Sequence, residues 1–358
     1  MRNIRAAVVA MVGMAMMLAA VLATAQGSGF RPTGPTTWVV IVGSEAMMEG
    51  TEYGTMGAWQ NARFYPDRLV VNEGDSVVFS FRTSDQHNVV FMPRGEMPAV
   101  HYLPAPWDRR RLVVNPIALT ATGGDRFDGT APVSSGLLAA APGSAWDWSV
   151  TLMATGTWTY VCTPHSARVP VLGAVGMVGR IEVRKAGSVL PASPEEVTAA
   201  ADKAVAADIA ADEAADAAAK QVTSRPGPNG STIWTMNTGF ESATGGERMR
   251  FGVPDLTIKV GDTVEWVQKS KYVPHTISFF SGADETPLTI AEGGILYANP
   301  AVEKPAGGVV YDGTGLVSSG FLGASKTYRL TFTTPGRYEY ICIPHDEMGM
   351  SAHITVTE

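Results

Sequence analysis

The sequence predicts an all-β protein made of two β-sandwich domains joined by an alanine-rich helix. Three observations support this fold class. The 358 residues include 38 glycines and 23 prolines, which favour many turns over long helices. Four sequence blocks occur twice in the same order, and the stretch between the two copies is rich in alanine. A chain of this length is also long enough for two domains, each with its own core.

The N-terminal segment has the layout of a secretory signal peptide. It reads "MRNIRAAVVAMVGMAMMLAAVLATAQG", with Arg2 and Arg5 before an apolar run and Ala23-Thr24-Ala25 at its end. We therefore expect residues 1–25 to be removed and the protein to be periplasmic or otherwise exported. The alternative is an uncleaved membrane anchor, because the apolar run approaches the length that spans a bilayer.

Internal repetition defines the two predicted domains, residues 36–184 and 231–358. Short β-rich segments separated by turns imply a β-sandwich in each copy. The matched blocks are "LVVNEGDSVVFSF" and "LTIKVGDTVEWV", "DGTAPVSSGLL" and "DGTGLVSSGFL", "TGTWTYVCTPH" and "TPGRYEYICIPH", and "GMVGRIEV" and "GMSAHITV".

The linker, residues 185–230, contains a predicted helix. Ser193 and Glu196 form a capping-box pattern, Pro194 suits the first helical position, and the alanines that follow have the highest helix propensity. Its apolar line is thin, and acidic residues cover much of the remaining surface. We expect a solvated helix packed lightly on one domain; a docking strip for a basic partner is the alternative.

Charge and cysteine content limit the function classes. The formal net charge is −7, and removal of Arg2 and Arg5 with the leader would leave −7 − 2 = −9. A net acidic protein repels phosphate backbones, which argues against a nucleic-acid partner. The only two cysteines, Cys162 and Cys342, occupy equivalent places in the two copies, so a disulfide would have to join equivalent points of two domains. We expect free thiols.

Each copy places a cysteine and two histidines in one pattern. The phrases "YVCTPH" and "YICIPH" supply a cysteine and a histidine three residues later, and one further histidine stands upstream in a strand-like context. A thiolate and two imidazoles suit copper, with a thioether as a weak axial ligand. Zinc recruits four strong ligands and would be served poorly. Four of the six histidines fall in these places: His87, His165, His275 and His345.

This pattern resembles the cupredoxins, in particular the plastocyanin-like blue-copper proteins. The resemblance implies two Greek-key β-sandwiches, each with one type 1 copper ion. In the second copy it assigns His275, Cys342 and His345 as equatorial ligands and Met350 as the axial ligand.

In the first copy the resemblance assigns His87, Cys162 and His165 in the same way. The axial position departs from the pattern, because Pro170 stands eight residues after Cys162 and cannot ligate through its ring. We expect a seven-residue insertion in the loop and Met177, which aligns with Met350, as axial ligand.

The resemblance also assigns Asn88 to hold the copper loop by hydrogen bonding. In the second copy Thr276 takes that place and could act only through its hydroxyl. Tyr160 and Tyr340, two residues before the cysteines, are expected in the core.

With these ligands in place the predicted function is electron transfer through the Cu(I)/Cu(II) couple. By resemblance, His165 and His345 would lie near the surface, where a redox donor and acceptor protein dock. Peripheral association with a membrane redox complex is a further alternative for the partner.

Two other function classes remain open. One is a copper enzyme of the two-domain nitrite reductase or multicopper oxidase type, for which only His101 and His353 are unassigned; we expect both at the surface. The other is copper storage or delivery. No catalytic copper site is evident in the sequence.

Overall fold

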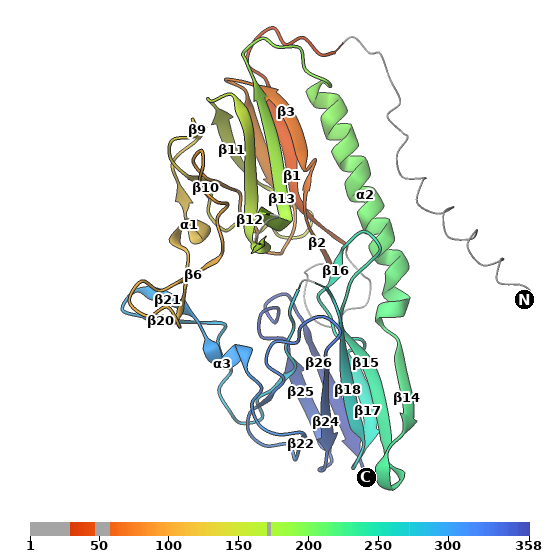
Figure 1. The fold of residues 1–358 in the computed structure, drawn as a ribbon. Helices are drawn as coiled ribbons and strands as arrows, with labels where there is room; N and C mark the ends of the chain where they lie inside the picture. The colour runs from red at the N-terminus through yellow and green to blue at the C-terminus, as the bar shows by residue number, and fades with distance from the viewer. Residues whose placement is uncertain (1–28, 47–57, 170–172, 272) are drawn as a thin grey trace, which may run out of the picture.

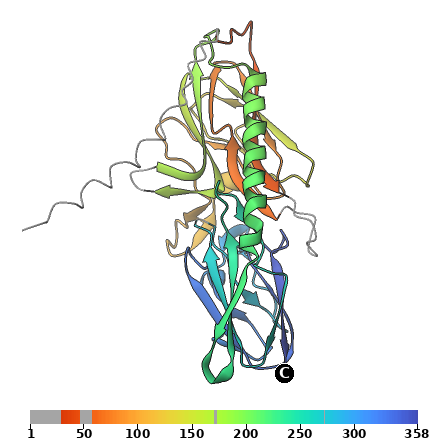
Figure 2. The same ribbon diagram turned by 90° about the vertical axis from the view of Figure 1, so that its right-hand side faces the viewer.

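The computed structural model describes residues 29–46, 58–169, 173–271 and 273–358; the predicted signal peptide lies outside them. Two β-domains are stacked end to end, and one long helix runs beside both (Figures 1 and 2). The predicted all-β fold class is confirmed. No helix in the described part of the chain is long and apolar enough to cross a membrane.

Two six-stranded sheets form the first domain and enclose its aromatic core. The first sheet contains, in spatial order, β16 (Glu247–Arg248), β2 (Trp59–Tyr65), β1 (Thr37–Ala46), β4 (Ser76–Phe81), β11 (Trp146–Leu152) and β9 (Arg126–Phe127). The second contains β3 (Arg68–Asn72), β13 (Gly173–Arg184), β12 (Gly156–Val169), β5 (Val90–Phe91), β10 (Val133–Ser135) and β8 (Ala121–Thr122).

Two five-stranded sheets form the second domain and repeat these pairings. One contains β14 (Val222–Pro226), β15 (Thr232–Phe240), β18 (Thr263–Lys269), β24 (Thr327–Phe332) and β22 (Val310–Tyr311). The other contains β17 (Asp255–Lys259), β26 (Ser351–Thr357), β25 (Gly336–Ile341), β19 (Ser278–Phe279) and β23 (Val317–Ser318). The parallel pair β1–β4 corresponds to β15–β18, and the antiparallel pair β12–β13 to β25–β26.

The repeated Gly-Asp turns have one structural role in both domains. The carboxylate of Asp75 accepts hydrogen bonds from the Trp38 indole at 2.9 Å and from the backbone of Asn72. The carboxylate of Asp262 likewise accepts a hydrogen bond from the Trp234 indole at 3.0 Å. Each aspartate therefore ties the turn before one strand to the start of the parallel strand beside it, and the repeated block has the same role in both domains.

Strand pairing across the domain boundary joins the two units. Strand β16 belongs to the second copy in sequence but pairs with β2 at the edge of a first-domain sheet, with Glu247 opposite Gln60 (Figure 1). A four-stranded sheet makes a second junction from β20 (Thr289–Glu292), β21 (Ile295–Ala298), β7 (Leu112–Val114) and β6 (Tyr102–Pro104). The short helices α1 (Pro116–Leu119) and α3 (Pro300–Glu303) lie close to it in sequence, and the 3-10 turn η1 (Pro228–Gly230) precedes β15.

The linker helix α2 (Pro194–Ala219) begins as predicted, with the Ser193–Glu196 capping box formed. The expectation of a solvated helix lightly packed on one domain is wrong. Three aspartates spaced four residues apart, Asp208, Asp212 and Asp216, are buried. They hydrogen-bond to side chains of β2 and, in one case, of β16, so these aspartates continue the buried face that begins with the apolar residues Ala201, Val205 and Ile209.

Candidate metal centres

The upstream histidine of each domain is fixed by the repeated Ser-Ser-Gly-x-Leu block. In the first domain the backbones of His87 and Leu138 exchange hydrogen bonds of 2.9 and 2.8 Å, and Ser135 accepts from the backbone N–H of Val89. In the second domain Leu322 donates to the His275 carbonyl at 2.9 Å, and Ser319 accepts from Ile277. The repeat of this block therefore has a local cause: it holds the segment that carries the histidine.

In the second domain the downstream cysteine and histidine lie on the loop between the last two strands, β25 and β26. In the first domain they lie inside β12, where its pairing with β13 is irregular: the pairs Val161–Val178 and Ser166–Gly176 flank this segment, so residues 162–165 stand opposite Met177 alone. The seven extra residues lengthen β12 and β13 into a hairpin that projects from the domain (Figure 2).

In the second domain the loop is a compact turn. The backbone N–H of Cys342 donates to the Met350 carbonyl at 2.9 Å, and Met350 in turn donates to the carbonyl of His345. Met350 and Met177 are both buried, each in the same core cluster as its cysteine.

Three donor atoms converge in each domain. The sulfur of Cys162 lies 3.4 Å from His87 Nδ1 and 3.5 Å from His165 Nδ1. In the second domain Cys342 Sγ lies 3.5 Å from His275 Nδ1 and 3.3 Å from His345 Nδ1, and the two nitrogens are 3.2 Å apart. The centre of a triangle of this size is about 2 Å from each corner, a usual metal–nitrogen bond length. One sulfur and two imidazoles in a triangle are the donor set of a type 1 copper site.

A hydrogen-bond frame surrounds each sulfur. Asn88 and Thr276, which directly follow the upstream histidines, donate their backbone N–H to Cys162 and Cys342 at 3.5 and 3.3 Å. The Asn88 amide also accepts from the backbone of Thr163 at 2.7 Å and donates to the hydroxyl of that residue at 2.8 Å. The expected role of Asn88 is thereby confirmed.

The Thr276 side chain holds the second-domain loop through its hydroxyl group alone. Its hydroxyl accepts a hydrogen bond from the backbone N–H of Ile343, next to Cys342, at 2.9 Å. Hydrogen bonds within the protein therefore tie Thr163 and Ile343, which follow the two cysteines, to the strand segment that carries the upstream histidine. The tyrosines two residues before the cysteines, Tyr160 and Tyr340, are buried as predicted.

Buried carboxylates contact the outer ring nitrogens, and the sequence did not reveal them. Asp85 Oδ2 lies 3.1 Å from His165 Nε2 in the first domain. In the second, Glu247 Oε1 lies 3.2 Å from His275 Nε2 and also accepts from the Ser270 hydroxyl. A carboxyl group on the outer nitrogen orients a ligating imidazole. At His165 the Asp85 carboxylate also raises the pKa of the ring, whereas burial raises the pKa of Glu247 well above its ordinary value. The resemblance implied that His165 faces a docking partner near the surface. The structure instead places its Nε2 against Asp85.

The pKa values of the two thiols are shifted in opposite directions. Burial raises the pKa of Cys162, but His87 and His165 outweigh it and bring the value down to about 6. Burial opposes charge on His165 as well, yet Asp85 and Cys162 hold its pKa well above the ordinary value. In the second domain burial raises the pKa of Cys342 to about 12. The histidines therefore favour the thiolate form of Cys162, whereas burial favours the neutral form of Cys342.

The second-domain histidine also responds to the first domain. Burial lowers the pKa of His345 well below its usual value, and His275 acts in the same direction. Asp85 of the first domain opposes this shift and His165 adds to it. The two His/Cys/His groups are therefore within electrostatic reach of each other.

A glycine in a strand bulge gives each upstream histidine its space. Gly43 interrupts the β1 register at φ 68°, and Gly239 interrupts the β15 register at φ 64°. A side chain at Gly43 would meet His87 Nε2 at 2.8 Å, and one at Gly239 would overlap His275 Nε2 and the Ser270 hydroxyl. Glycine adopts this conformation without strain, and bulges are frequent beside functional sites.

Gly239→Ala should therefore weaken copper binding in the second domain about 10- to 100-fold, the usual cost of disturbing a contact that orients a ligand. Titration of the metal-free protein with copper, followed by its visible colour, measures this. Gly261→Ala is the matched control, because Gly261 has φ 90° but nothing within 4 Å of an added side chain. It should cost about 1 kcal/mol of stability for the left-handed backbone and leave the affinity unchanged. Equal affinity losses in both variants would contradict the steric argument.

Two unassigned histidines are not at the surface, contrary to expectation. His101 is half-buried, and its Nδ1 lies 3.2 Å from the Thr163 hydroxyl in the first copper-binding loop. Burial lowers its pKa to about 4, and His165 contributes in the same direction. His353 lies on β26 and is buried. Within the described ranges only two groups of three metal-binding side chains converge, and neither includes these histidines.

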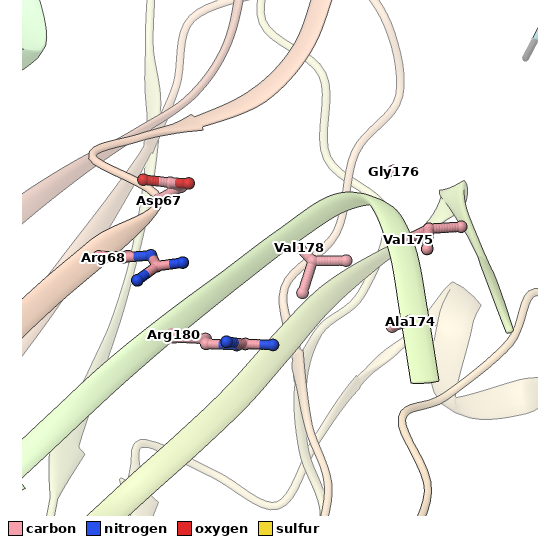
Figure 3. Close-up of a pocket in the computed structure, with 7 residues that line it drawn as sticks. All are labelled: Asp67, Arg68, Ala174, Val175, Gly176, Val178 and Arg180. Carbon is pink, nitrogen blue, oxygen red and sulfur yellow. The ribbon is translucent and has the colours of Figure 1, made fainter. Parts of the chain in front are cut away.

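A pocket beside the projecting hairpin carries no comparable chemistry. Figure 3 shows charged side chains along one part of it and small apolar side chains along another. Its lining residues are Asp67, Arg68, Ala174, Val175, Gly176, Val178 and Arg180, none of which belongs to a His/Cys/His group.

Comparison with known proteins agrees with this geometry. The sequence matches the copper-binding proteins of the plastocyanin/azurin family over residues 53–184 and 238–357. Amicyanin-alpha of Methylorubrum extorquens is 31% identical over 101 residues, which cover 28% of this chain and 60% of that protein. Plastocyanin of Scenedesmus fuscus is 33% identical over 107 residues, which cover 30% of this chain and 85% of that protein.

Among solved structures, a mutant plastocyanin of fern is 20% identical, with a TM-score of 0.21; the match covers 34% of this chain and 99% of that chain. The chain spans 60% of the length of amicyanin-alpha, less than two thirds of it. The family match covers both halves of the chain. We conclude that this chain belongs to the copper-binding proteins of the plastocyanin/azurin family, as a tandem of two cupredoxin domains whose His/Cys/His groups fit type 1 copper sites.

Proposed function

We propose that the chain is an exported electron carrier that uses two type 1 copper sites, one per domain. The observation that carries this proposal is the pair of donor triangles, each built from one cysteine sulfur and two histidine Nδ1 atoms. The proposed ligands are His87, Cys162, His165 and Met177 in residues 36–184, and His275, Cys342, His345 and Met350 in residues 231–358. Residues 185–230 are the proposed linker.

Bound copper supplies a one-electron couple between Cu(I) and Cu(II). The protein's own contribution is rigidity. The N–H groups of Asn88 and Thr276 face the sulfurs, and the strand pairs on both sides of each loop hold the donors in place. A donor set fixed in this way changes little when the charge of the site changes, so electron transfer requires little rearrangement.

The two methionines support the same arrangement in both domains. Met177 and Met350 each follow a glycine with positive φ, Gly176 at 91° and Gly349 at 81°. Both are buried with the cysteine of their domain, despite the seven-residue difference in loop length. We therefore retain both as the proposed weak axial ligands.

Copper loading of the mature protein tests the proposal. We expect two copper ions per chain, an intense visible colour, and reversible bleaching when a reductant converts Cu(II) to Cu(I). Colourless protein that binds two copper ions per chain would reject type 1 sites in both domains.

The same preparation tests the alternative functions. Release of Cu(I) to an acceptor protein without redox cycling would favour storage or delivery, and turnover of nitrite would favour an enzyme. Export through cleavage after residue 25 is a separate part of the proposal, and N-terminal sequencing of secreted protein tests it. A redox protein donor and a redox protein acceptor are the proposed partners.

A further inference from the structure

Both carboxylates that contact the copper-binding histidines lie at the boundary between the domains. Glu247, which contacts His275 of the second domain, comes from β16, and that strand pairs with β2 of the first domain. Asp85, which contacts His165 of the first domain, also acts electrostatically on His345 of the second. Strand β16, which carries Glu247, lies between the two stacked units in Figure 1, and the electrostatic contact of Asp85 with His345 brings the two groups of ligands together at the same boundary.

A run of contacts joins the two groups of ligands. Starting at His165, it passes to the Asp85 carboxylate and, through the Asp85 N–H, to the Thr83 hydroxyl at 3.2 Å. That hydroxyl donates to the Gln60 side chain, and Gln60 stands opposite Glu247 in the β2–β16 pair. Glu247 then contacts His275 Nε2. We call Gln60, Thr83, Asp85 and Glu247 the inter-site junction.

The junction is buried and braced. The exposed fractions of Gln60, Thr83 and Glu247 are 1%, 0% and 5%, and that of Asp85 is 8%. Helix α2 bridges the same strands, because Asp216 accepts hydrogen bonds from Trp59 of β2 and Arg248 of β16. The spacing of the two sites is therefore set by the fold of a single chain.

We propose that the two copper centres exchange an electron directly within one chain, across the inter-site junction. This inference rests on the proposed function, since it requires copper at both sites. One electron leaves Cu(I) at one centre and enters Cu(II) at the other, so that the first is oxidised as the second is reduced. No proton moves and no other reactant takes part. A donor can then deliver an electron to one domain while an acceptor removes it from the other.

Fast kinetics on the fully loaded chain test the exchange. A pulse of radiolytic reductant delivers less than one electron per oxidised chain, and the visible spectrum follows how the electron redistributes between the two centres. We expect a phase whose rate does not change on dilution. A one-to-one mixture of Cys162→Ser and Cys342→Ser proteins is the control, and any exchange there should slow in proportion to concentration. If redistribution in the intact chain also slows on dilution, or is absent, the inference is wrong.

A substitution at the junction gives an independent readout. Asp85→Asn removes a negative charge that faces both sites, which destabilises Cu(II) relative to Cu(I). We expect the reduction potential to rise at both centres, measured separately in the Cys162→Ser and Cys342→Ser backgrounds. Asp202→Asn is the matched control: it removes the same charge at the exposed helix surface, where salt screens it, and should shift neither potential.

The outcomes separate this inference from the proposed function. If only the first-domain potential rises in Asp85→Asn, the second centre does not sense the junction and the inference fails, while type 1 copper stands. If neither domain acquires the visible colour on loading, the proposed function itself fails. Should Asp85→Asn not fold, the dilution experiment on the unsubstituted chain still decides.

Discussion

In Cys162→Ser protein we expect the first-domain copper signal to disappear and the second-domain signal to remain; Cys342→Ser should do the reverse. Each cysteine supplies the only sulfur in its donor triangle, and serine oxygen does not replace a soft thiolate for copper. Copper content should fall from two ions to one per chain, the largest effect that a single substitution can have here. Visible and electron paramagnetic resonance spectra measure each component.

Substitution of either cysteine by serine also alters the shape of its site as little as possible. Serine differs from cysteine in one atom, so the core around residue 162 or 342 keeps its shape. Equal loss of both signals from one substitution would mean that the two sites load together, and retention of both would show that the cysteine is not a ligand. Circular dichroism of the metal-free variants checks that the fold is intact.

The sequence predicted the two His/Cys/His groups because they are repeated and local. A cysteine, a proline and a histidine within four residues form their own loop, and two copies in matching contexts exclude coincidence. Asn88 was found through the family resemblance, and Thr276 takes its place in the second copy because both residues directly follow the upstream histidines. What a strand and its turn determine locally can be predicted from one sequence.

The sequence did not predict Asp85 and Glu247, because neither has a counterpart in the other copy. His87 aligns with His275, which places Val273 where Asp85 would be, and Glu247 lies on a strand that pairs with the other domain. Their contacts depend on how the domains dock, which no local pattern encodes. The bulge glycines Gly43 and Gly239 did leave a signal, since an isolated glycine inside a strand pattern indicates a bulge or a close backbone approach.

The linker helix shows why the acidic face was misjudged. Aspartates on a helix usually face solvent, and the thin apolar line gave no reason to expect that acidic residues continue the buried face. The hydrogen-bond partners of these aspartates lie outside the helix in sequence; they are Asn61, Arg63, Tyr65 and Arg248. The four-residue spacing of Asp208, Asp212 and Asp216 was visible, but only the tertiary partners reveal that this stripe is buried.

A second large effect, on stability, is expected at Asp216, which links helix α2 to β2 and β16. Asp216 Oδ1 lies 3.1 Å from Arg248 Nε of β16 and 3.3 Å from the Trp59 indole nitrogen of β2, and it also pairs with Lys220. Arg248 is 4% exposed, so Asp216→Asn would leave a buried guanidinium without its countercharge. We expect the free energy of unfolding to fall by about 3 kcal/mol at pH 7, the usual cost of removing one member of a buried ion pair.

The same loss should depend on pH in a defined direction. Burial raises the pKa of Asp216, but Lys220 and Arg248 outweigh it and lower the value below that of the unfolded chain, about 3.9. A carboxyl group with a lowered folded pKa stabilises the fold above its unfolded pKa, and this contribution disappears as the pH falls through the folded value. The stability difference between the unsubstituted protein and Asp216→Asn should therefore be complete at pH 7 and close as the pH falls below about 4.

Equilibrium denaturation followed by tryptophan fluorescence measures both effects on metal-free protein. Asp202→Asn, on the same helix but exposed, should change the stability by less than about 0.5 kcal/mol at either pH. A gap of equal size at pH 3 and pH 7 would mean that the Asp216 charge does not hold the domains. If the gap closes as expected, the internal electron exchange proposed above should be slower in Asp216→Asn, because the helix no longer fixes β16 against β2.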